Sequence, residues 1–152
     1  MDKVKYTQTH EWIEIETIQG IMPSERKRIG TVGITERGQL ECGQIAYVEL
    51  PDEGNEYEQE EPVCALELVN GDVHIVHSPV TGEILENNKA LKDDPDLINQ
   101  TPEGDGWLFK ISIDIPRELS LLMDANAYEL FDEDDYEEDD EDDEDVYEFD
   151  EY

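Results

Sequence analysis

The 152-residue chain carries 43 Asp and Glu residues against 10 Lys and Arg, a formal net charge of −33. This charge argues against nucleic acid or an anionic membrane surface as a partner, because both would repel the chain. Basic protein surfaces and divalent cations remain compatible with it.

The acidic residues are concentrated at the C-terminal end. Of the 21 residues from Asp132 to Tyr152, 16 are Asp or Glu and none is Lys or Arg. With so little apolar content, residues 132–152 are predicted to form a disordered acidic tail. Residues 1–131 keep a net charge of −17 and are long enough for one domain with a core of ordinary size.

Cysteine usage and the N-terminal stretch bear on location. Cys42 and Cys64 form no CxxC motif and are predicted to be buried thiols in a reducing compartment, in preference to a disulfide. Met1–Ile15 lacks a signal-peptide core, and no run approaches the ~20 apolar residues of a membrane span. We expect a cytoplasmic monomer.

Apolar alternation predicts a series of short strands in chain order, at residues 13–16, 29–34, 45–50, 83–86 and 107–113. Gln19–Arg28 is predicted to be an exposed loop. Its basic cluster, Arg26-Lys27-Arg28, is either solvated or pairs with the acidic tail.

Capping signals predict short helices between and after these strands. Thr35 is the expected N-cap of a helix over residues 36–40, and Asp94 that of a helix over 95–99 with Pro95 at its first position. A C-terminal helix is predicted to begin at Asp114-Ile115-Pro116, with Leu119, Leu122 and Met123 at helical spacing for packing, and Asp124 is expected to cap a second helical turn through residues 128–131.

The centre of the chain is a predicted hairpin around Asn70-Gly71. Asn-Gly is the strongest short-range signal for a two-residue type I′ turn. That turn pairs Val69 with Asp72, Leu68 with Val73, Glu67 with His74 and Leu66 with Ile75. Leu66, Leu68, Val73 and Ile75 are then expected on one buried face, with Glu67 and His74 on the other.

Turns every 8 to 12 residues between short strands indicate a mainly β fold with small peripheral helices, either a β-sandwich or a flattened barrel.

Short motifs in a fixed order carry a resemblance to a known family. They are Tyr6-Thr7 with His10-Glu11-Trp12; Val32-Gly33-Ile34-Thr35 with Gln39; Gly43, Ile45 and Val48-Glu49-Leu50-Pro51 with Gly54; Pro79-Val80-Thr81-Gly82-Glu83; Gly104-Asp105-Gly106-Trp107-Leu108; and Asp124-Ala125 with Ala127-Tyr128. From residue 6 to residue 131 the chain thus resembles the lipoyl-carrying H-protein family of the glycine cleavage system. Two features depart from the family. Arg37 stands where the family tends to carry an aromatic residue, and the acidic tail has no family counterpart.

The resemblance implies a lipoyl/biotinyl-like flattened β-barrel, the barrel-sandwich hybrid, as residues 1–131. It implies a carrier, not an enzyme. Such a protein holds lipoate on one lysine and shuttles an aminomethyl group and electrons between glycine decarboxylase, aminomethyltransferase and dihydrolipoyl dehydrogenase.

The family's lysine lies at a hairpin tip, in a motif resembling Glu-Ser-Val-Lys-Ala. The matching run here is Glu67-Leu68-Val69-Asn70-Gly71, with Asn70 at the lysine position. Because the spacing to Pro79 is one residue longer, Gly71 is an equally fair match. Neither residue offers the amine that acylation requires, and the chain has no lysine between Lys27 and Lys89. We therefore expect no lipoate cofactor.

Other candidate residues have both functional and structural interpretations. The Asn70-Gly71 tip is either the remnant of a carrier site that presents a binding surface or simply a good turn. Its flanking residues that can contact a partner are Glu67, Val69, Asp72 and His74. Glu67 and His74 are expected to form a cross-strand polar pair, with an acid–base pair as the alternative.

The remaining histidines offer no obvious metal or catalytic set. His74 and His77, three residues apart, are expected on opposite faces of one strand, which disfavours joint metal binding. His10 is expected to be structural, near the edge of the sandwich, with binding of a lipoyl arm or a partner as the alternative.

These observations favour a non-catalytic binding or regulatory module of the H-protein type without lipoate. Its expected protein partners are glycine-cleavage components or lipoyl-transfer enzymes. Three alternatives stay open: a working carrier with an atypical attachment site, a polyanionic protein acting through its acidic tail, and an unrelated enzyme. The last lacks a convergent nucleophile, base and metal set.

Overall fold

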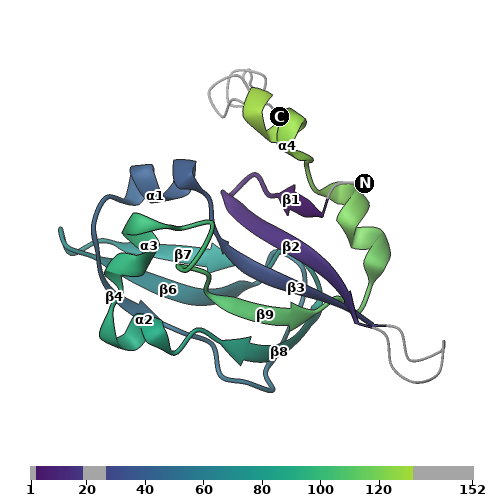
Figure 1. Cartoon of the computed structure of the whole chain (residues 1–152), viewed down its shortest axis with the longest axis horizontal. Coiled ribbons are helices and arrows are strands. Elements are labelled where there is room, and N and C mark those ends of the chain that lie inside the picture. The colour runs from purple at the N-terminus through teal and green to yellow at the C-terminus, as the bar shows by residue number, and fades with distance from the viewer. Residues whose placement is uncertain (1–2, 19–26, 132–152) are drawn as a thin grey trace, which may run out of the picture.

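The computed structural model describes residues 3–18 and 27–131. The acidic tail and most of the Gln19–Arg28 loop lie outside the described residues. Within the described residues the strands form two antiparallel sheets (Figure 1). A six-stranded sheet has the order β1-β2-β3-β9-β8-β5, and a three-stranded sheet has the order β4-β6-β7. The strands are β1 (Val4–Tyr6), β2 (Glu11–Ile18), β3 (Lys27–Ile34), β4 (Ile45–Glu49), β5 (Glu56–Tyr57), β6 (Pro62–Leu68), β7 (Val73–His77), β8 (Gly82–Asn87) and β9 (Phe109–Ser112).

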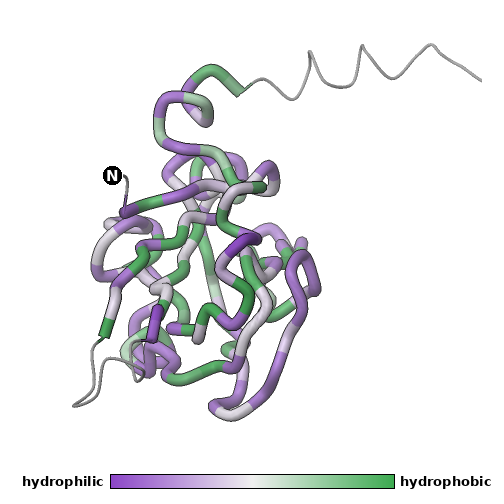
Figure 2. Tube along the Cα trace, turned by 90° about the vertical axis from the view of Figure 1, so that its right-hand side faces the viewer, coloured by the Kyte–Doolittle hydropathy of each residue, from purple (hydrophilic) through white to green (hydrophobic). Residues whose placement is uncertain are grey.

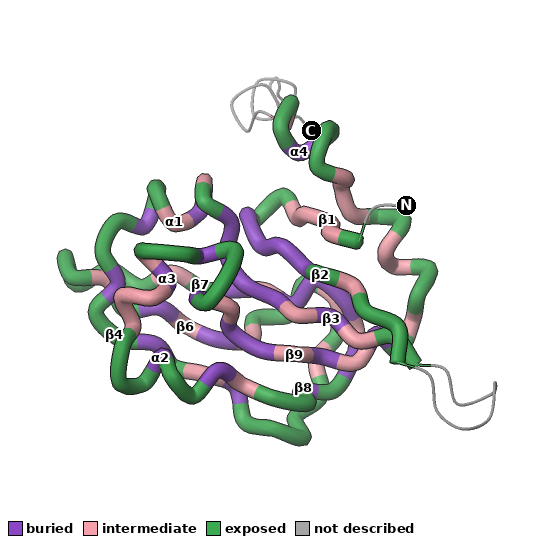
Figure 3. The backbone as a smooth tube through the Cα atoms, in the orientation of Figure 1, coloured by how far each residue is buried: buried purple, intermediate pink, exposed green. Residues whose placement is uncertain are grey.

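The two sheets share one apolar core, so the predicted sandwich or flattened barrel is confirmed. Strand side chains alternate between the two faces of each sheet, and the inward ones meet between the layers. Figures 2 and 3 show hydrophobic and buried stretches recurring along the strands. The core comprises Ile13, Val32, Ile34, Ile45, Val48, Cys64, Leu66, Val76, Val80, Ile84, Leu91, Ile98, Leu108, Phe109, Ile111 and Ile113. Cys42 and Cys64 are buried and unbridged, as expected.

Short helices occupy the periphery of the sheets. They are α1 (Glu36–Cys42), α2 (Ala90–Asp93), α3 (Asp96–Gln100), the 3₁₀ helix η2 (Pro116–Leu121) and α4 (Ala125–Leu130). None of the helices in the described residues is long and apolar enough to cross a membrane.

Two of the predicted helix caps are confirmed and one is wrong. The Thr35 hydroxyl accepts from the Gly38 N–H, and the Asp124 carboxylate accepts from the Ala127 N–H. The N-cap of α3 is Pro95, without a side-chain hydrogen bond, in place of Asp94.

The β2–β3 hairpin extends further than its sequence suggests. Lys27 and Arg28, predicted to belong to an exposed loop, begin β3 and pair with Ile18 and Thr17. Backbone pairing continues the ladder even though the side chains are exposed. No apolar pattern in the sequence predicts β1, β5 or α2. Backbone hydrogen bonds and packing hold these short elements in place.

The central hairpin forms, but its predicted turn is wrong. The N–H of Leu68 donates to the carbonyl of Asp72, and the N–H of Gly71 donates to the carbonyl of Leu68. Val69, Asn70 and Gly71 therefore make a three-residue loop. Gly71 has φ 96° and Asn70 does not have a positive φ, which fits a turn closed by a glycine and not a type I′ turn.

The extra loop residue moves the register by one position. Glu67 pairs with Val73, Leu66 with His74 and Ala65 with Ile75. A slip of one residue exchanges the faces of a strand. The predicted assignment is thus correct for β6 and wrong for β7.

The corrected register gives a different set of buried residues. Leu66 and Val76 are fully buried and His74 is partly buried, whereas Val73 and Ile75 are 55% and 40% exposed. The predicted buried face containing Val73 and Ile75 is therefore replaced by one containing His74 and Val76.

Gly82 provides a test of how closely β8 and β9 approach. A Cβ at this position would clash with the backbone carbonyl of Ser112 on the neighbouring strand. We expect Gly82→Ala to lower the free energy of unfolding by about 1–3 kcal/mol, because the backbones must move apart. Urea unfolding measures this.

The matched control is Gly104→Ala. Its Cβ would meet the Thr101 side chain at an ordinary 3.6 Å, so its unfolding curve should stay close to that of the native chain. Equal effects at Gly82 and Gly104 would contradict the close strand approach.

Candidate functional site

The hairpin tip is exposed and carries no amine. Val69, Asn70, Gly71 and Asp72 are all exposed. The Asn70 side-chain oxygen accepts from the Asp72 N–H at 2.9 Å, and the Val69 N–H donates to the Gln44 carbonyl at 3.0 Å. The loop is thus held by its own hydrogen bonds and by the start of β4.

The predicted Glu67–His74 pair is wrong because the register places these residues on opposite faces. Glu67 points outward and is exposed, whereas His74 lies opposite Leu66 on the inner face. Burial lowers the pKa of His74, the nearby His77 adds to this, and the Glu41 carboxylate opposes it. Within the described part of the chain, the Nε2 atom of His74 is buried and has no hydrogen-bond partner. An acid–base role for the pair therefore has no geometric basis.

His10 lies in a packed polar cluster next to the C-terminal helix. It is 3% exposed with φ 71°. Its Nδ1 is 2.6 Å from the hydroxyl of Tyr128, which is in turn 2.7 Å from the Thr35 hydroxyl. Its Nε2 lies 3.6 Å from the Glu41 carboxylate. These contacts join the loop before β2 to α1 and α4.

Arg37 anchors the C-terminal end of α4. Its guanidinium donates to the carbonyls of Tyr128 and Phe131 at 3.0 and 3.1 Å. It also lies 4.9 Å and 5.8 Å from the centroids of their rings. A cation here suits the negative end of the helix and the aromatic faces together.

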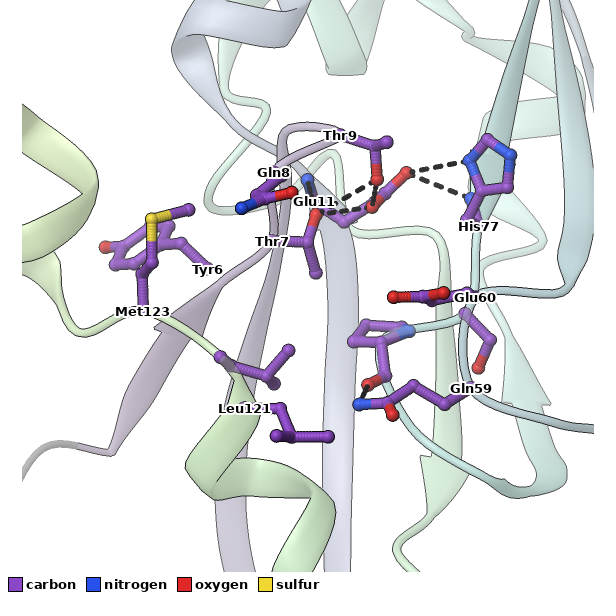
Figure 4. Close-up of a pocket in the computed structure, with 13 residues that line it drawn as sticks. Tyr6, Thr7, Gln8, Thr9, Glu11, Gln59, Glu60, His77, Leu121 and Met123 are labelled. Atoms are coloured by element: carbon purple, nitrogen blue, oxygen red, sulfur yellow. Dashed lines mark hydrogen bonds and ion pairs between the residues drawn. The ribbon is translucent and has the colours of Figure 1, made fainter. Parts of the chain in front are cut away.

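A buried carboxylate that sequence reasoning did not single out is that of Glu11. Its side chain is fully buried. The Thr7 and Thr9 hydroxyls donate to one carboxylate oxygen at 2.6 and 2.5 Å. The His77 N–H donates to the other oxygen at 2.9 Å, with the His77 ring Nδ1 at 3.7 Å (Figure 4). Glu11 thus links the loop before β2 to the end of β7.

Burial raises the pKa of the Glu11 carboxyl above its ordinary value of 4.5. The hydrogen bonds from His77, Thr7 and Thr9 act in the opposite direction, as does the imidazole charge of His77. The loss of hydration on burial outweighs these effects, so the pKa of the Glu11 carboxyl stays above its ordinary value.

A cavity of about 570 Å³ opens beside this carboxylate. Figure 4 shows Glu60 and Gln59 near one side and Tyr6 and Met123 near the other. The cavity is lined by Tyr6, Thr7, Gln8, Thr9, Glu11, Gln59, Glu60, His77, Ser78, Pro79, Leu121, Leu122 and Met123. The exposed Glu60 carboxylate and the apolar wall suit a small group that donates hydrogen bonds. Among the described residues no group of three or more metal-ligand side chains is assembled.

Part of this site has a signal in the sequence. Thr7 and Thr9, four and two residues before Glu11 respectively, are hydroxyl donors at a spacing that can reach a following carboxylate. The contribution of His77, 66 residues away, follows only from the packing of the two sheets.

Comparison with known proteins identifies the family. The family model for the glycine cleavage H-protein matches residues 4–135. The chain belongs to the glycine cleavage H-protein family. The match includes both the hairpin and Glu11, and it leaves most of the acidic tail outside.

Individual relatives agree with this assignment. The chain is 41% identical to the glycine cleavage system H protein of Thermotoga maritima, over 86% of this chain and 97% of the relative. It is 37% identical to that of Rhodospirillum rubrum, over 86% and 96%. The crystal structure of the H protein from Mycobacterium marinum matches with a TM-score of 0.70 at 29% identity, covering 84% of this chain and 94% of that one.

The raised pKa of the buried Glu11 carboxyl predicts how the stability of this H-protein family member changes with pH. A folded carboxyl with a raised pKa binds its proton more tightly than the unfolded one. The native chain therefore loses stability from this group as the pH rises from 4.5 through the raised pKa. Glu11→Gln removes that loss.

The difference in the free energy of unfolding, variant minus native, should accordingly become more favourable to the variant as the pH rises. Urea unfolding at a series of pH values measures it, and Glu14→Gln, an exposed carboxylate on the same strand, controls for the loss of one negative charge. A difference that falls with pH would contradict the raised pKa of Glu11.

Proposed function

We propose that this H-protein family member carries no lipoate and acts as a non-catalytic docking module for glycine-cleavage components or lipoyl-transfer enzymes. The observation that carries the proposal is the exposed three-residue loop of the β6–β7 hairpin. By the resemblance of Glu67–Gly71 to the family's attachment motif, this is where the carrier lysine belongs, and the loop holds Asn70 and Gly71 instead.

The chemistry of attachment supports this proposal. Acylation of the lipoyl type needs a primary amine whose neutral form attacks an activated acyl group. An asparagine amide has its lone pair in resonance and a glycine has no side chain. Lys89 is the next lysine along the chain, and its ammonium group is 3.1 Å from the Glu53 carboxylate beside α2, away from the hairpin.

The outer face of the three-stranded sheet supports a docking role. Tyr47, Glu67 and Val73 are cross-strand neighbours on this face, and Glu49, Ala65 and Ile75 form the adjacent row. Tyr47, Val73 and Ile75 are 51%, 55% and 40% exposed. We call this surface, made of those six residues, the outer face.

The segment that carries the outer face has formal charges of one sign. Residues 38–88 contain 12 Asp and Glu residues and no Lys or Arg. Exposed apolar groups bordered by carboxylates suit a partner surface with an apolar centre and a Lys- or Arg-rich rim. Charge of one sign also accelerates encounter with such a partner.

The absence of lipoate is tested by co-expression with a lipoate ligase and intact-mass spectrometry. We expect the native chain to keep its unmodified mass, because the hairpin offers no amine. An H protein with an attachment lysine serves as the positive control. A gain of one lipoyl group on the native chain would favour a carrier with an atypical attachment site and overturn the proposal.

The docking surface is tested by titrating glycine decarboxylase, aminomethyltransferase, dihydrolipoyl dehydrogenase and a lipoate ligase against the native chain. The Tyr47→Thr/Val73→Thr variant keeps β-compatible residues but removes apolar area. It should weaken binding of the cognate partner about tenfold, a loss of ~1.4 kcal/mol.

The control is Leu85→Thr on β8, where the leucine is 41% exposed in the other sheet. Its affinity should match that of the native chain. The proposal fails if none of the four proteins binds, or if both variants bind as the native chain does.

A further inference from the structure

A groove on the other sheet gathers the positive charge of this acidic molecule. Its volume is about 900 Å³, and it lies between strands β1, β2, β3 and β9 and the 3₁₀ helix η2. It is lined by Lys3, Lys5, Glu14, Ile15, Glu16, Thr17, Arg28, Thr31, Lys110, Pro116, Leu119 and Ser120. Four of the chain's 10 basic residues are therefore in one groove. We call it the basic groove.

Three of these cations have no ion-pair partner in the described part of the fold. Among the described residues, Lys3, Lys5 and Arg28 form no salt bridge. Lys110 lies 3.8 Å from the Glu86 carboxylate. Glu14 neutralises part of the groove, as does Glu16, and the net charge of the lining stays positive.

We propose that the acidic segment 132–152 of the same chain docks in the basic groove. This segment carries 16 carboxylates and no cation, so its charge is complementary to the groove. The rest of the described surface, which belongs to a body of net charge −17, repels it. Electrostatics therefore directs the segment to this groove.

The apolar lining fits the same occupant. Ile15, Pro116 and Leu119 lie among the cations. The acidic segment has aromatic residues between its carboxylates, namely Tyr136, Tyr147, Phe149 and Tyr152. Aromatic rings can bury area against such a lining while neighbouring carboxylates meet the ammonium and guanidinium groups.

The segment starts within reach of the groove. Helix α4 ends at Leu130 and packs on β1, where Tyr128 stacks on Tyr6 with ring centroids 4.8 Å apart. Strand β1 also carries Lys5, with Lys3 just before it. Twenty-one residues span up to about 70 Å when fully extended, so the segment can reach the whole groove, and tethering raises its local concentration there.

Zero-length carbodiimide cross-linking of the full chain, followed by peptide mapping, tests the proposal. Cross-links from segment 132–152 to Lys3 and Lys5 should exceed those to Lys89 and Lys92 at least fivefold. They should occur in monomeric protein and fall sharply at 0.5 M salt, where the Debye length is only about 4–5 Å. Equal yields at all lysines, or cross-links confined to covalent dimers, would overturn the proposal.

The hydrodynamic radius gives a second readout. Salt should change it in opposite directions in the native chain and in a variant without the basic groove. Salt releases a docked segment, so the radius of the native chain should increase from low salt to 0.5 M. In Lys3→Glu/Lys5→Glu the segment has no basic groove, and salt should instead reduce its self-repulsion and the radius. Lys89→Glu/Lys92→Glu, outside the groove, should behave like the native chain. A native radius that decreases with salt would overturn the proposal.

Discussion

The three-residue loop at Val69–Gly71 is the constraint on which the arrangement of the site depends. A hairpin loop of this length is commonly closed by a residue at positive φ, and Gly71 supplies it at 96°. The loop sets the register of β6 against β7 and so decides which side chains face the core. His74 is turned inward, while Val73 and Ile75 are turned outward beside Tyr47. The exposed tip and the outer face both follow from one turn.

A second constraint holds the end of the same hairpin. The carboxylate of Glu11 is buried, and three donors from the loop before β2 and the end of β7 satisfy it. A buried carboxylate is tolerated where such donors compensate for its lost hydration. The hairpin is therefore attached at its base to the six-stranded sheet. The turn at its tip and the carboxylate at its base together position it.

Much of the fold could be predicted from local patterns. Alternation predicted β2, β3, β4, β8 and β9, and the hydroxyl of Thr35 and carboxylate of Asp124 predicted two helix starts. These features depend on residues close together in the chain. The prediction of the turn was wrong because Asn-Gly suits both a type I′ turn and a three-residue loop closed by glycine. The difference of one loop residue exchanges the two faces of a whole strand.

The site was less predictable because it depends on distant contacts. Glu11 meets His77, and Arg37 meets the carbonyls of Tyr128 and Phe131. In the sequence Arg37 is only a departure from the family pattern, and its packing on α4 shows what the guanidinium does. The basic groove likewise joins residues from both ends of the chain, Lys3 and Lys110 among them.

The central claim is that the hairpin of this H-protein family member presents a binding surface and carries no prosthetic group. The most direct test is the intact mass of the protein purified from the cells that naturally make it. The account predicts the mass of the unmodified polypeptide. A mass increased by one lipoyl group, through any linkage, would contradict it.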